Sequence, residues 1–436
     1  MSMLRYWVWL SLRRGLRPES RNALLERFGD PCAIWNASER EIGEIVWRDA
    51  ERSTLRDRAM EKTQSILDAC ARLEVHILTM QDADYPARLR NIFDPPCVLY
   101  VLGRLPAIDD TAAIAVVGTR KATPYGLKMG RQMGYELTRG GALIVSGLAE
   151  GVDSAAAEGA LRAGGSCVGV LGTAIDVVYP PKNRKLFEDV CTVGALVSEY
   201  PPGAPTARGN FPQRNRILSG LSVGVVVIEA PERSGALITA DRALEQGRDL
   251  FVVPGNADSP NCAGSNALMR DCAKPVTGGL DVLSEYTHLF RGVDISAPQN
   301  LAMPAEQQRE IAAEYAGSNT PAPEEGAWFH RLRVPRAARL HEGKPQEQTF
   351  QVPERSAPEL TFDPMQLSET ERALAAALVS PRMHIDDVIA KSGLTASEAL
   401  SALTMLEIEG IVAQEPGKLF TLLARPKEAA QSPQRE

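Results

Sequence analysis

Residues 113–118 read Ala-Ile-Ala-Val-Val-Gly and are followed at once by Thr119-Arg120. The run does not alternate with polar residues, which is typical of a strand buried on both faces of a sheet. Five more runs of this kind follow, at residues 142–145, 167–171, 195–197, 223–228 and 250–253. Segments with the length and apolar spacing of helices separate them, among them residues 126–139, 153–163 and 237–246. This alternation predicts an α/β fold in which a parallel sheet carries helices on both faces.

The chain has 436 residues, which is too long for one ordinary domain. Residues 1–80 show helical spacing and turn signals, so we expect a small helical module there, with Ser38 capping one helix. The α/β core is expected at residues 81–291. Residues 292–363 are rich in Pro, Ala, Glu and Gln without periodicity, which predicts a flexible linker. Within that linker, the apolar and basic island from Trp328 to Arg333 could dock on another surface.

Residues 364–424 regain a regular pattern, and residues 425–436 are expected to form a loose tail. Two helical segments, at 384–391 and 395–409, precede two short strands at 410–414 and 418–422, a winged helix-turn-helix pattern. A recognition helix for duplex DNA should be basic, but here four basic residues stand against eight acidic ones. The basic ones are Arg372, Arg382, Lys391 and Lys418; the acidic ones are Glu369, Glu371, Asp386, Asp387, Glu398, Glu407, Glu409 and Glu415. We therefore expect this domain to contact protein, or DNA only weakly.

The overall composition is that of a globular protein, with 44% hydrophobic and 24% charged residues and a net charge of −7. Any binding of nucleic acid must therefore come from a local basic patch. The seven cysteines are odd in number and form no C-x-x-C pair, so we expect them to be reduced and mostly buried. No stretch approaches the roughly 20 apolar residues that span a bilayer. We expect a cytoplasmic protein with no membrane span.

Glycines and hydroxyl groups recur where the predicted strands end. The segments concerned are Gly118-Thr119-Arg120, Ser146 to Asp153, Tyr179-Pro180-Pro181-Lys182-Asn183 and Ser234 to Thr239. Ligands of an open parallel sheet collect at the carboxyl ends of its strands. Glycine lets backbone N–H groups approach an anion, and helix N-termini favour negative charge. Four such segments at one edge predict an anion site, although each glycine taken alone could simply allow a tight turn.

Several enzyme signatures are missing from the sequence. It contains no G-x-x-x-x-G-K-[ST], no G-x-G-x-x-G after the first strand, no G-x-S-x-G and no H-E-x-x-H. The five histidines, at positions 76, 288, 330, 341 and 384, lie outside the predicted main sheet. We therefore expect no catalytic residue, no metal site and no cofactor.

A basic and aromatic segment points to the class of ligand. Residues 211–216 read Phe-Pro-Gln-Arg-Asn-Arg, and between residues 182 and 216 six basic residues stand against three acidic ones. An aromatic ring beside guanidinium groups is the combination that stacks bases and holds phosphates on single strands. Phe211 could equally lie in the core. An ion-pair role for Arg214 and Arg216 is the weaker alternative, because acidic neighbours in the sequence are few.

These motifs resemble those of the DNA-processing protein A (DprA/Smf) family. The resemblance runs through Asp84-Tyr85-Pro86, Pro95 to Tyr100, the four strand-end segments, Phe211 to Arg216 and Gln246 to Gly255. It implies an extended Rossmann-like core between an N-terminal helical (SAM-like) module and a C-terminal winged helix. It also implies sequence-independent binding of single-stranded DNA, homodimerisation, and loading of a RecA-type recombinase in natural transformation and recombination. The candidate DNA-binding residues are Gly118, Thr119, Arg120, Lys182, Asn183, Phe211, Arg214, Asn215, Arg216, Ser234, Gly235 and Thr239.

Two other functions stay open on the same fold. One is an enzyme of the lysine-decarboxylase-like group that cleaves nucleoside monophosphates, a phosphoribohydrolase. Its Pro-Gly-Gly-x-Gly-Thr loop is missing, because residues 233–239 read Arg-Ser-Gly-Ala-Leu-Ile-Thr. The other is a nucleotide sensor that uses the winged domain as its output.

Overall fold

The structure, a computed structural model, describes residues 3–316 and parts of the region between residues 361 and 426. The described parts of that region are residues 361–362, 368–377, 383–395, 398–399, 402–403, 406, 411–415, 419–422 and 425–426. The chain divides into two compact units, Met1–Arg339 and Leu340–Glu436, which are described separately. The island at residues 328–333 lies outside the described residues.

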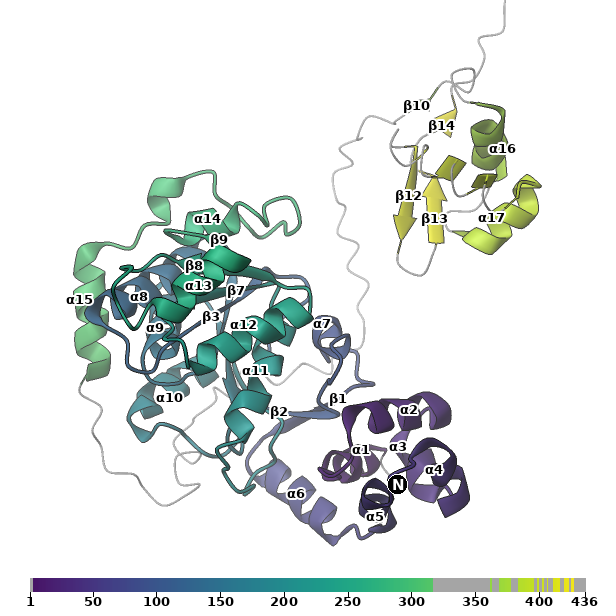
Figure 1. Ribbon diagram of the computed structural model, residues 1–436, viewed down its shortest axis with the longest axis horizontal. Helices are drawn as coiled ribbons and strands as arrows, with labels where there is room; N and C mark the ends of the chain where they lie inside the picture. The colour runs from purple at the N-terminus through teal and green to yellow at the C-terminus, as the bar shows by residue number, and fades with distance from the viewer. Residues whose placement is uncertain are drawn as a thin grey trace, which may run out of the picture. The chain divides into compact units, whose positions relative to one another are not determined.

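A nine-stranded sheet forms the centre of the first unit, in the order β1-β2-β6-β5-β4-β3-β7-β8-β9 (Figure 1). The strands are β1 (His76–Thr79), β2 (Val98–Gly103), β3 (Ala113–Gly118), β4 (Leu143–Ser146), β5 (Cys167–Leu171), β6 (Ala195–Ser198), β7 (Gly224–Ile228), β8 (Asp249–Val253) and β9 (Lys274–Pro275). The six runs expected from the sequence are β3 to β8, and they pair in parallel. The Rossmann-like prediction is therefore confirmed. The sheet is mixed, however, because β1 and β2 extend it with antiparallel pairs.

Helices cover both faces of this sheet, because side chains of each strand alternate between two cores. On β3, Ile114 and Val116 join one core, while Ala115 and Val117 join the other. The first core takes in α8 (Pro124–Arg139), α9 (Val152–Arg162) and α10 (Arg184–Val193). The second takes in α7 (Ala87–Arg90), α11 (Asn210–Leu221) and α12 (Gly235–Glu245). Five of the seven free cysteines are buried, as expected.

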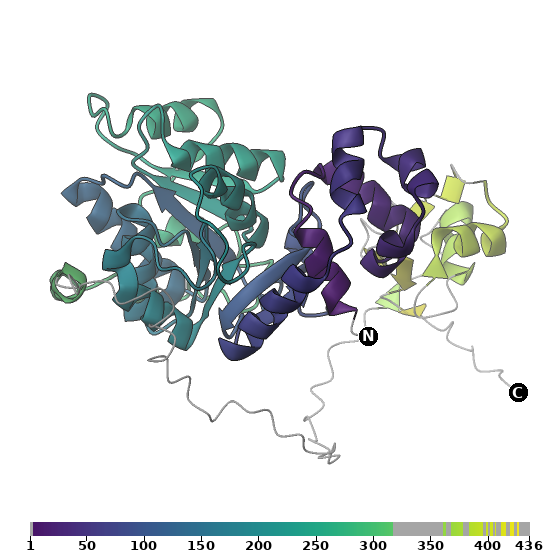
Figure 2. The ribbon, with the colours of Figure 1, turned by 90° about the horizontal axis from the view of Figure 1, so that it is seen from below.

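The N-terminal module contains α1 (Leu4–Ser11), α2 (Pro18–Phe28), α3 (Pro31–Asn36), α4 (Glu39–Ile45), α5 (Asp49–Arg56) and α6 (Glu61–Arg72). It packs around Trp9, Leu24, Ile34 and Leu55, and it lies beside the β1–β2 end of the sheet (Figure 2). Ser38 caps α4 in a capping box with Glu41, as its sequence position predicts. Residues 76–79, which fall within the predicted helical segment, form β1 and so belong to the sheet.

Part of the segment predicted to be a linker packs on the core. Val293 and Leu301 are buried, and α15 (Ala305–Ala316) lies against α8 and α9 with Ile311 only 1% exposed. The apolar residues of this stretch are few, so composition alone suggested a flexible chain. Polar contacts add to this packing, because Glu310 and Glu314 of α15 form ion pairs with Arg162 and Lys185 of the core.

The second unit has the elements of a winged helix, as predicted. They are α16 (Glu369–Ala377), β11 (Met383–His384), α17 (Ile385–Ser392), β12 (Val412–Glu415) and β13 (Leu419–Leu422), the strands pairing in the order β11-β13-β12. Leu374, Val388, Leu403 and Phe420 form its core. A separate pair joins β10 (Thr361–Phe362) to β14 (Arg425–Pro426). Residues 416–417, between the two predicted strands of the wing, lie outside the described residues.

The approach of α8 to α9 depends on glycine, and this leads to a prediction about stability. A Cβ on Gly134 would overlap the carbonyl oxygen of Ala156 on α9. We expect Gly134→Ala to lower the free energy of unfolding by roughly 1–3 kcal/mol, the usual cost of overpacking. Urea denaturation measures this, with Gly292→Ala as the control, because a Cβ on Gly292 meets no atom within 4 Å. Equal stability of the two variants would contradict the close backbone approach.

Candidate nucleic-acid interface

A cleft of about 520 Å³ opens where β3, β4, β5 and β7 end. A smaller pocket continues it, and the two share Arg120, Ala149, Tyr179, Phe211 and Arg214. The lining therefore combines arginines, two aromatic rings and, at Ser234 and Gly235, the start of α12. This is the edge at which the sequence predicts an anion site.

Arg214 is buried at the base of this cleft. Its Nη1 donates a hydrogen bond of 2.6 Å to the carbonyl oxygen of Val170. Its Nε has no hydrogen-bond partner among the described residues, although the residue is only 4% exposed. Burial lowers the pKa of Arg214 to about 10, so the side chain still carries its charge at pH 7. A buried cation with an unused donor beside a cleft is suited to attract an anion.

Asp153 lies opposite Arg214, with Gly147 between them. A Cβ on Gly147 would overlap both Arg214 Nη1 and Asp153 Oδ2, so a larger residue at this position would displace one or both of these groups. Burial raises the pKa of Asp153 to about 6, although the charge of Arg214 and a backbone N–H from Gly118 lower it in part. The carboxylate thus balances the charge of Arg214 inside the protein.

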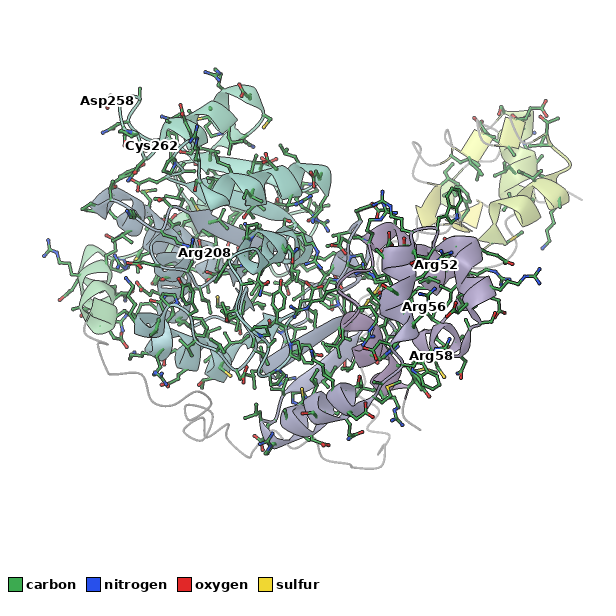
Figure 3. All side chains as sticks on the ribbon, turned by 60° about the horizontal axis from the view of Figure 1, so that its bottom comes forward. Arg52, Arg56, Arg58, Arg208, Asp258 and Cys262 are labelled. Carbon is green, nitrogen blue, oxygen red and sulfur yellow. The ribbon has the colours of Figure 1, made fainter. Side chains whose placement is uncertain are left out.

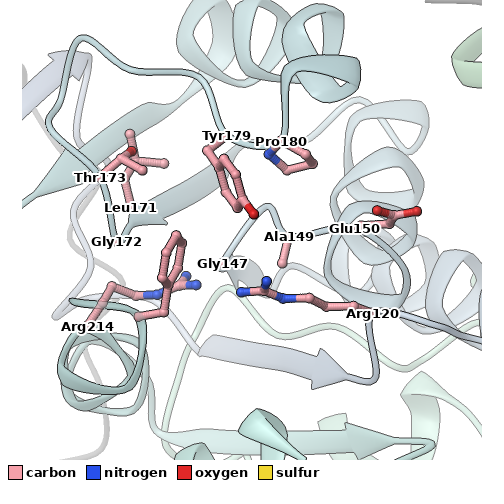
Figure 4. Close-up of a pocket in the computed structure, with 11 residues that line it drawn as sticks. Arg120, Gly147, Ala149, Glu150, Leu171, Gly172, Thr173, Tyr179, Pro180 and Arg214 are labelled. Carbon is pink, nitrogen blue, oxygen red and sulfur yellow. The ribbon is translucent and has the colours of Figure 1, made fainter. Parts of the chain in front are cut away.

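Two aromatic rings and a second arginine form the upper part of the cleft. The ring centroids of Tyr179 and Phe211 are 5.4 Å apart, with their planes at 48°. The guanidinium carbon of Arg120 lies 5.2 Å from the centroid of Phe211. Arg120 and Arg214 reach the cleft from opposite sides, below the ring of Tyr179 (Figure 4).

The sequence is compatible with Phe211 either in the core or in contact with DNA, and its position in the structure has features of both. The ring is half-buried against Gly172, where a Cβ would come within 2.7 Å of Phe211 Cδ1. The ring also lines the cleft. Tyr179 is 44% exposed and is a lining residue that the candidate set lacks. Tyr179 could have been found from its position in the segment Tyr179-Pro180-Pro181-Lys182-Asn183. Only Lys182 and Asn183 of that segment are among the candidate DNA-binding residues.

The N-terminus of α12 faces the cleft and is open. Ser234 caps the helix by accepting a hydrogen bond of 3.2 Å from the Ala236 N–H, and a Cβ on Gly235 would meet no atom within 4 Å. Asn215 ties α11 to this turn, because its Nδ2 donates to the Gly235 carbonyl at 3.1 Å. Thr239 lines the cleft one turn further along the helix. The turn can therefore accept a phosphate.

The start of α8 differs from that of α12, since a carboxylate already occupies it. Glu229 accepts a hydrogen bond of 2.8 Å from the Thr123 N–H and another from the Thr123 hydroxyl group. Two further arginines, Arg208 and Arg233, line the cleft, and Arg233 directly precedes the N-cap residue of α12. Arg208 lies over the core, well apart from Arg52, Arg56 and Arg58 on the helical module (Figure 3). Neither Arg208 nor Arg233 was in the candidate set, although both stand in segments that the sequence singled out.

Most of the remaining candidate residues also lie at this edge. Gly118 and Thr119 line the cleft, and the Thr119 hydroxyl accepts a hydrogen bond of 3.2 Å from the Lys121 N–H. Lys182 forms an ion pair with Glu150, which itself lines the smaller pocket. Asn183 donates to the Leu148 carbonyl at 2.9 Å and so fixes the loop after β4.

Arg216 is the exception, because it lies outside the cleft and forms ion pairs within the protein. Its Nε lies 2.9 Å from Asp94 Oδ2, and its Nη2 lies 2.7 Å from Glu199 Oε1. It does not line the cleft. Few acidic residues are near it in sequence, but Asp94 is brought to it from 122 positions away. Arg216 therefore has the structural ion-pair role that appeared the weaker alternative.

Neither a metal-binding cluster nor a membrane-spanning helix is found among the described residues. No cluster of three or more His, Cys, Asp or Glu side chains is arranged to hold a metal ion within that part of the chain. Nor does the same part contain a helix with the length and apolar character needed to cross a bilayer.

The comparisons with known proteins agree with the geometry of this unit. Residues 76–287 match the family model of DNA recombination-mediator protein A, and residues 356–418 match that of the DprA winged helix domain. Protein Smf of Synechocystis sp. is 33% identical over 420 residues, covering 95% of this chain and 98% of the relative. DNA processing protein DprA of Bacillus subtilis is 37% identical, covering 54% of this chain and 79% of the relative. The X-ray structure of DprA from Streptococcus pneumoniae superposes with a TM-score of 0.57 at 34% identity, covering 65% of this chain and 99% of that one.

Proposed function

This chain belongs to the DNA-processing protein A (DprA/Smf) family, and we propose that it binds single-stranded DNA without sequence preference in the cleft that Arg214 and Phe211 line. The observation that carries the proposal is the buried, incompletely bonded Arg214 at the base of this cleft. Around it, Arg120 and the open start of α12 supply further positive charge for phosphates. Phe211 and Tyr179 supply ring faces for bases.

The same set of groups supports binding that does not depend on sequence. Every base has a π face, so stacking on Phe211 and Tyr179 accepts any of them. Phosphate contacts carry no sequence information. The proposed interface thus keeps most of the candidate set and adds Tyr179, Arg208 and Arg233. Arg216 is left out of it, and Lys182 and Asn183 act by holding the loop after β4.

The proposals on assembly and on the role in recombination rest on the membership of this chain in the DprA/Smf family. We propose that the chain acts as a homodimer, that it is not an enzyme, and that it loads a RecA-type recombinase onto incoming DNA during transformation or recombination. The acidic winged domain supports a contact with protein in this process, since it holds twice as many acidic as basic residues between positions 365 and 424. Analytical ultracentrifugation tests the homodimer, and recombinase filament assembly on coated DNA tests the loading.

A nucleotide-sensing role is the second candidate, because one observation favours it. A cleft of about 520 Å³ is within the usual size of small-molecule sites. Binding of a mononucleotide in preference to oligo-dT would support this alternative. Release of ribose phosphate from a nucleoside monophosphate would instead support the phosphoribohydrolase.

Anisotropy of labelled oligo-dT at several salt concentrations tests the main proposal. We expect tight binding. The logarithm of the association constant should fall linearly with the logarithm of the salt concentration. Arg120→Ala should reduce that slope by about one, because one phosphate contact is lost. Phe211→Ala should weaken binding by roughly 1–3 kcal/mol with little change in slope, because a stacked base is lost.

The control is Arg270→Ala, since Arg270 is a largely exposed arginine on α13 (Ala263–Asp271) that does not line the cleft. It should bind DNA like the unchanged protein. Absence of oligo-dT binding at low salt would overturn the proposal.

A further inference from the structure

We propose that the N-terminal helical module positions α11, and with it the DNA cleft, through an ion-pair network that joins Arg21 to Arg216. This inference rests on the proposed function, because the cleft residues Phe211 and Arg214 are carried by α11. It makes Arg216 a positioning residue that does not contact DNA. It also makes the module part of the DNA-binding machinery, although the module does not line the cleft.

The network runs from the module to α11 through the loop before β2. Arg21, on α2, places its Nη2 2.8 Å from Asp94 Oδ1. The second oxygen of Asp94 lies 2.9 Å from Arg216 Nε. Asp94 is thus shared by one arginine of the module and one arginine of α11. On its other side, Arg216 reaches Glu199, which follows β6, at 2.7 Å.

The network is substantially shielded from solvent. The side chains of Arg21 and Arg216 are only 12% and 10% exposed. Burial by itself would lower the pKa of Arg216, but the charges of Glu199 and Asp94 raise it above its usual value. Ion pairs that are held away from water are screened far less than pairs on the surface. Salt therefore weakens the link between the module and α11 less than it would weaken a surface pair.

A second contact connects the module to the first turns of α11. The guanidinium carbon of Arg14, which follows α1, lies 5.2 Å from the ring centroid of Tyr200. The hydroxyl group of Tyr200 is in turn 3.3 Å from Gln213 Oε1 on α11. In addition, Asn22 Nδ2 donates to the Phe93 carbonyl at 3.1 Å, which holds the loop that contains Asp94. The module thus reaches α11 by two routes.

Helix geometry explains why this anchor controls the cleft. Arg214 and Arg216 are two positions apart, so they point to sides of α11 that differ by about 200°. Arg214 faces Gly147 and the cleft, and Arg216 faces the network. The N-cap residue Gly209 makes no side-chain capping bond, so the start of α11 lacks that local support. A rotation of α11 that breaks the Arg216 pairs must therefore also move Arg214 and Phe211.

The test compares arginine-to-methionine variants in the full chain by oligo-dT anisotropy at several salt concentrations. We expect Arg216→Met and Arg21→Met each to weaken binding about five- to tenfold, at the low end of typical coupling between sites. The salt slope should stay unchanged, because neither side chain contacts a phosphate. Arg131→Met is the matched control: it breaks another shielded pair, with Glu158 at 2.9 Å on α9, and should leave DNA binding unchanged.

Hydrogen exchange provides a second readout that a purely structural role would not change. Adding oligo-dT should slow exchange in α2, which does not line the cleft, and Arg216→Met should abolish this effect while the cleft stays protected. A salt slope reduced by about one in Arg216→Met would mean direct phosphate contact and would overturn the inference. Unchanged affinity in Arg21→Met would overturn it as well. Failure of the unchanged protein to bind oligo-dT would instead overturn the proposed function, and the inference would fall with it.

Discussion

Arg214→Met is expected to weaken oligo-dT binding by about a hundredfold or more and to destabilise the folded protein at pH 7. The affinity is lost because charged hydrogen bonds contribute about 1.5–3 kcal/mol each and Arg214 is the buried cation of the cleft. The stability is lost because the buried Asp153 carboxyl loses the positive charge that favours its ionised form. Anisotropy and urea denaturation measure the two effects separately.

A double variant separates the two roles of Arg214. In Arg214→Met/Asp153→Asn the uncompensated carboxylate is gone, so most of the stability should return while DNA binding stays lost. The stability defect of the single variant should also shrink at pH 5, because the Asp153 carboxyl is then protonated. Recovery of DNA binding in the double variant would show that Arg214 acts on the fold alone. Equal stability defects at pH 5 and pH 7 would contradict an electrostatic influence of Arg214 on Asp153.

Single-stranded DNA binding is expected to tighten as the pH falls through about 6, by up to about tenfold per pH unit, the limit for one proton. Below that pH the Asp153 carboxyl is neutral, and the charge of Arg214 is available to the DNA phosphate. Arg120 and the backbone N–H groups of Gly118 and Ala149 also act on this carboxyl, all favouring its charged form. Anisotropy between about pH 5 and pH 8 at constant ionic strength measures the effect.

Asp153→Asn is the control for this pH dependence. It should bind DNA at least as tightly as the unchanged protein at pH 7.5, and its affinity should vary little with pH, because no histidine lines the cleft. A pH dependence that survives in this variant would contradict the assignment.

The raised pKa of Asp153 should also affect how the stability of the DNA-free protein depends on pH. Burial raises the pKa of Asp153 from its usual 3.8 to about 6, so the folded form holds this proton more tightly than the unfolded chain. The contribution of Asp153 to stability is therefore fully present below pH 3.8 and is lost as the pH rises through about 6.

Much of the fold could be predicted from the sequence because its signals are local. The strands β3 to β8 are short apolar runs without alternation, and such runs identify strands buried on both faces. The strands β1 and β2 were not predicted. They form an antiparallel extension at the edge of the sheet and are not part of the strand–helix alternation that identifies β3 to β8. The packing of α15 was missed because it depends on a few apolar residues meeting a surface that the rest of the chain builds.

The sequence by itself determined the edge of the sheet at which the candidate site lies, because the carboxyl ends of parallel strands must meet there. It also determined the chemistry of that edge, through Arg120, Phe211, Arg214 and the Ser234-Gly235 turn. Only the tertiary structure decided which of two neighbouring arginines faces the cleft. Arg214 and Arg216 look alike in sequence, but a helix turns about 100° per residue, so they face different surroundings. The partner of Arg216 is Asp94, 122 residues away, and no local pattern can reveal a pairing that folding alone brings about.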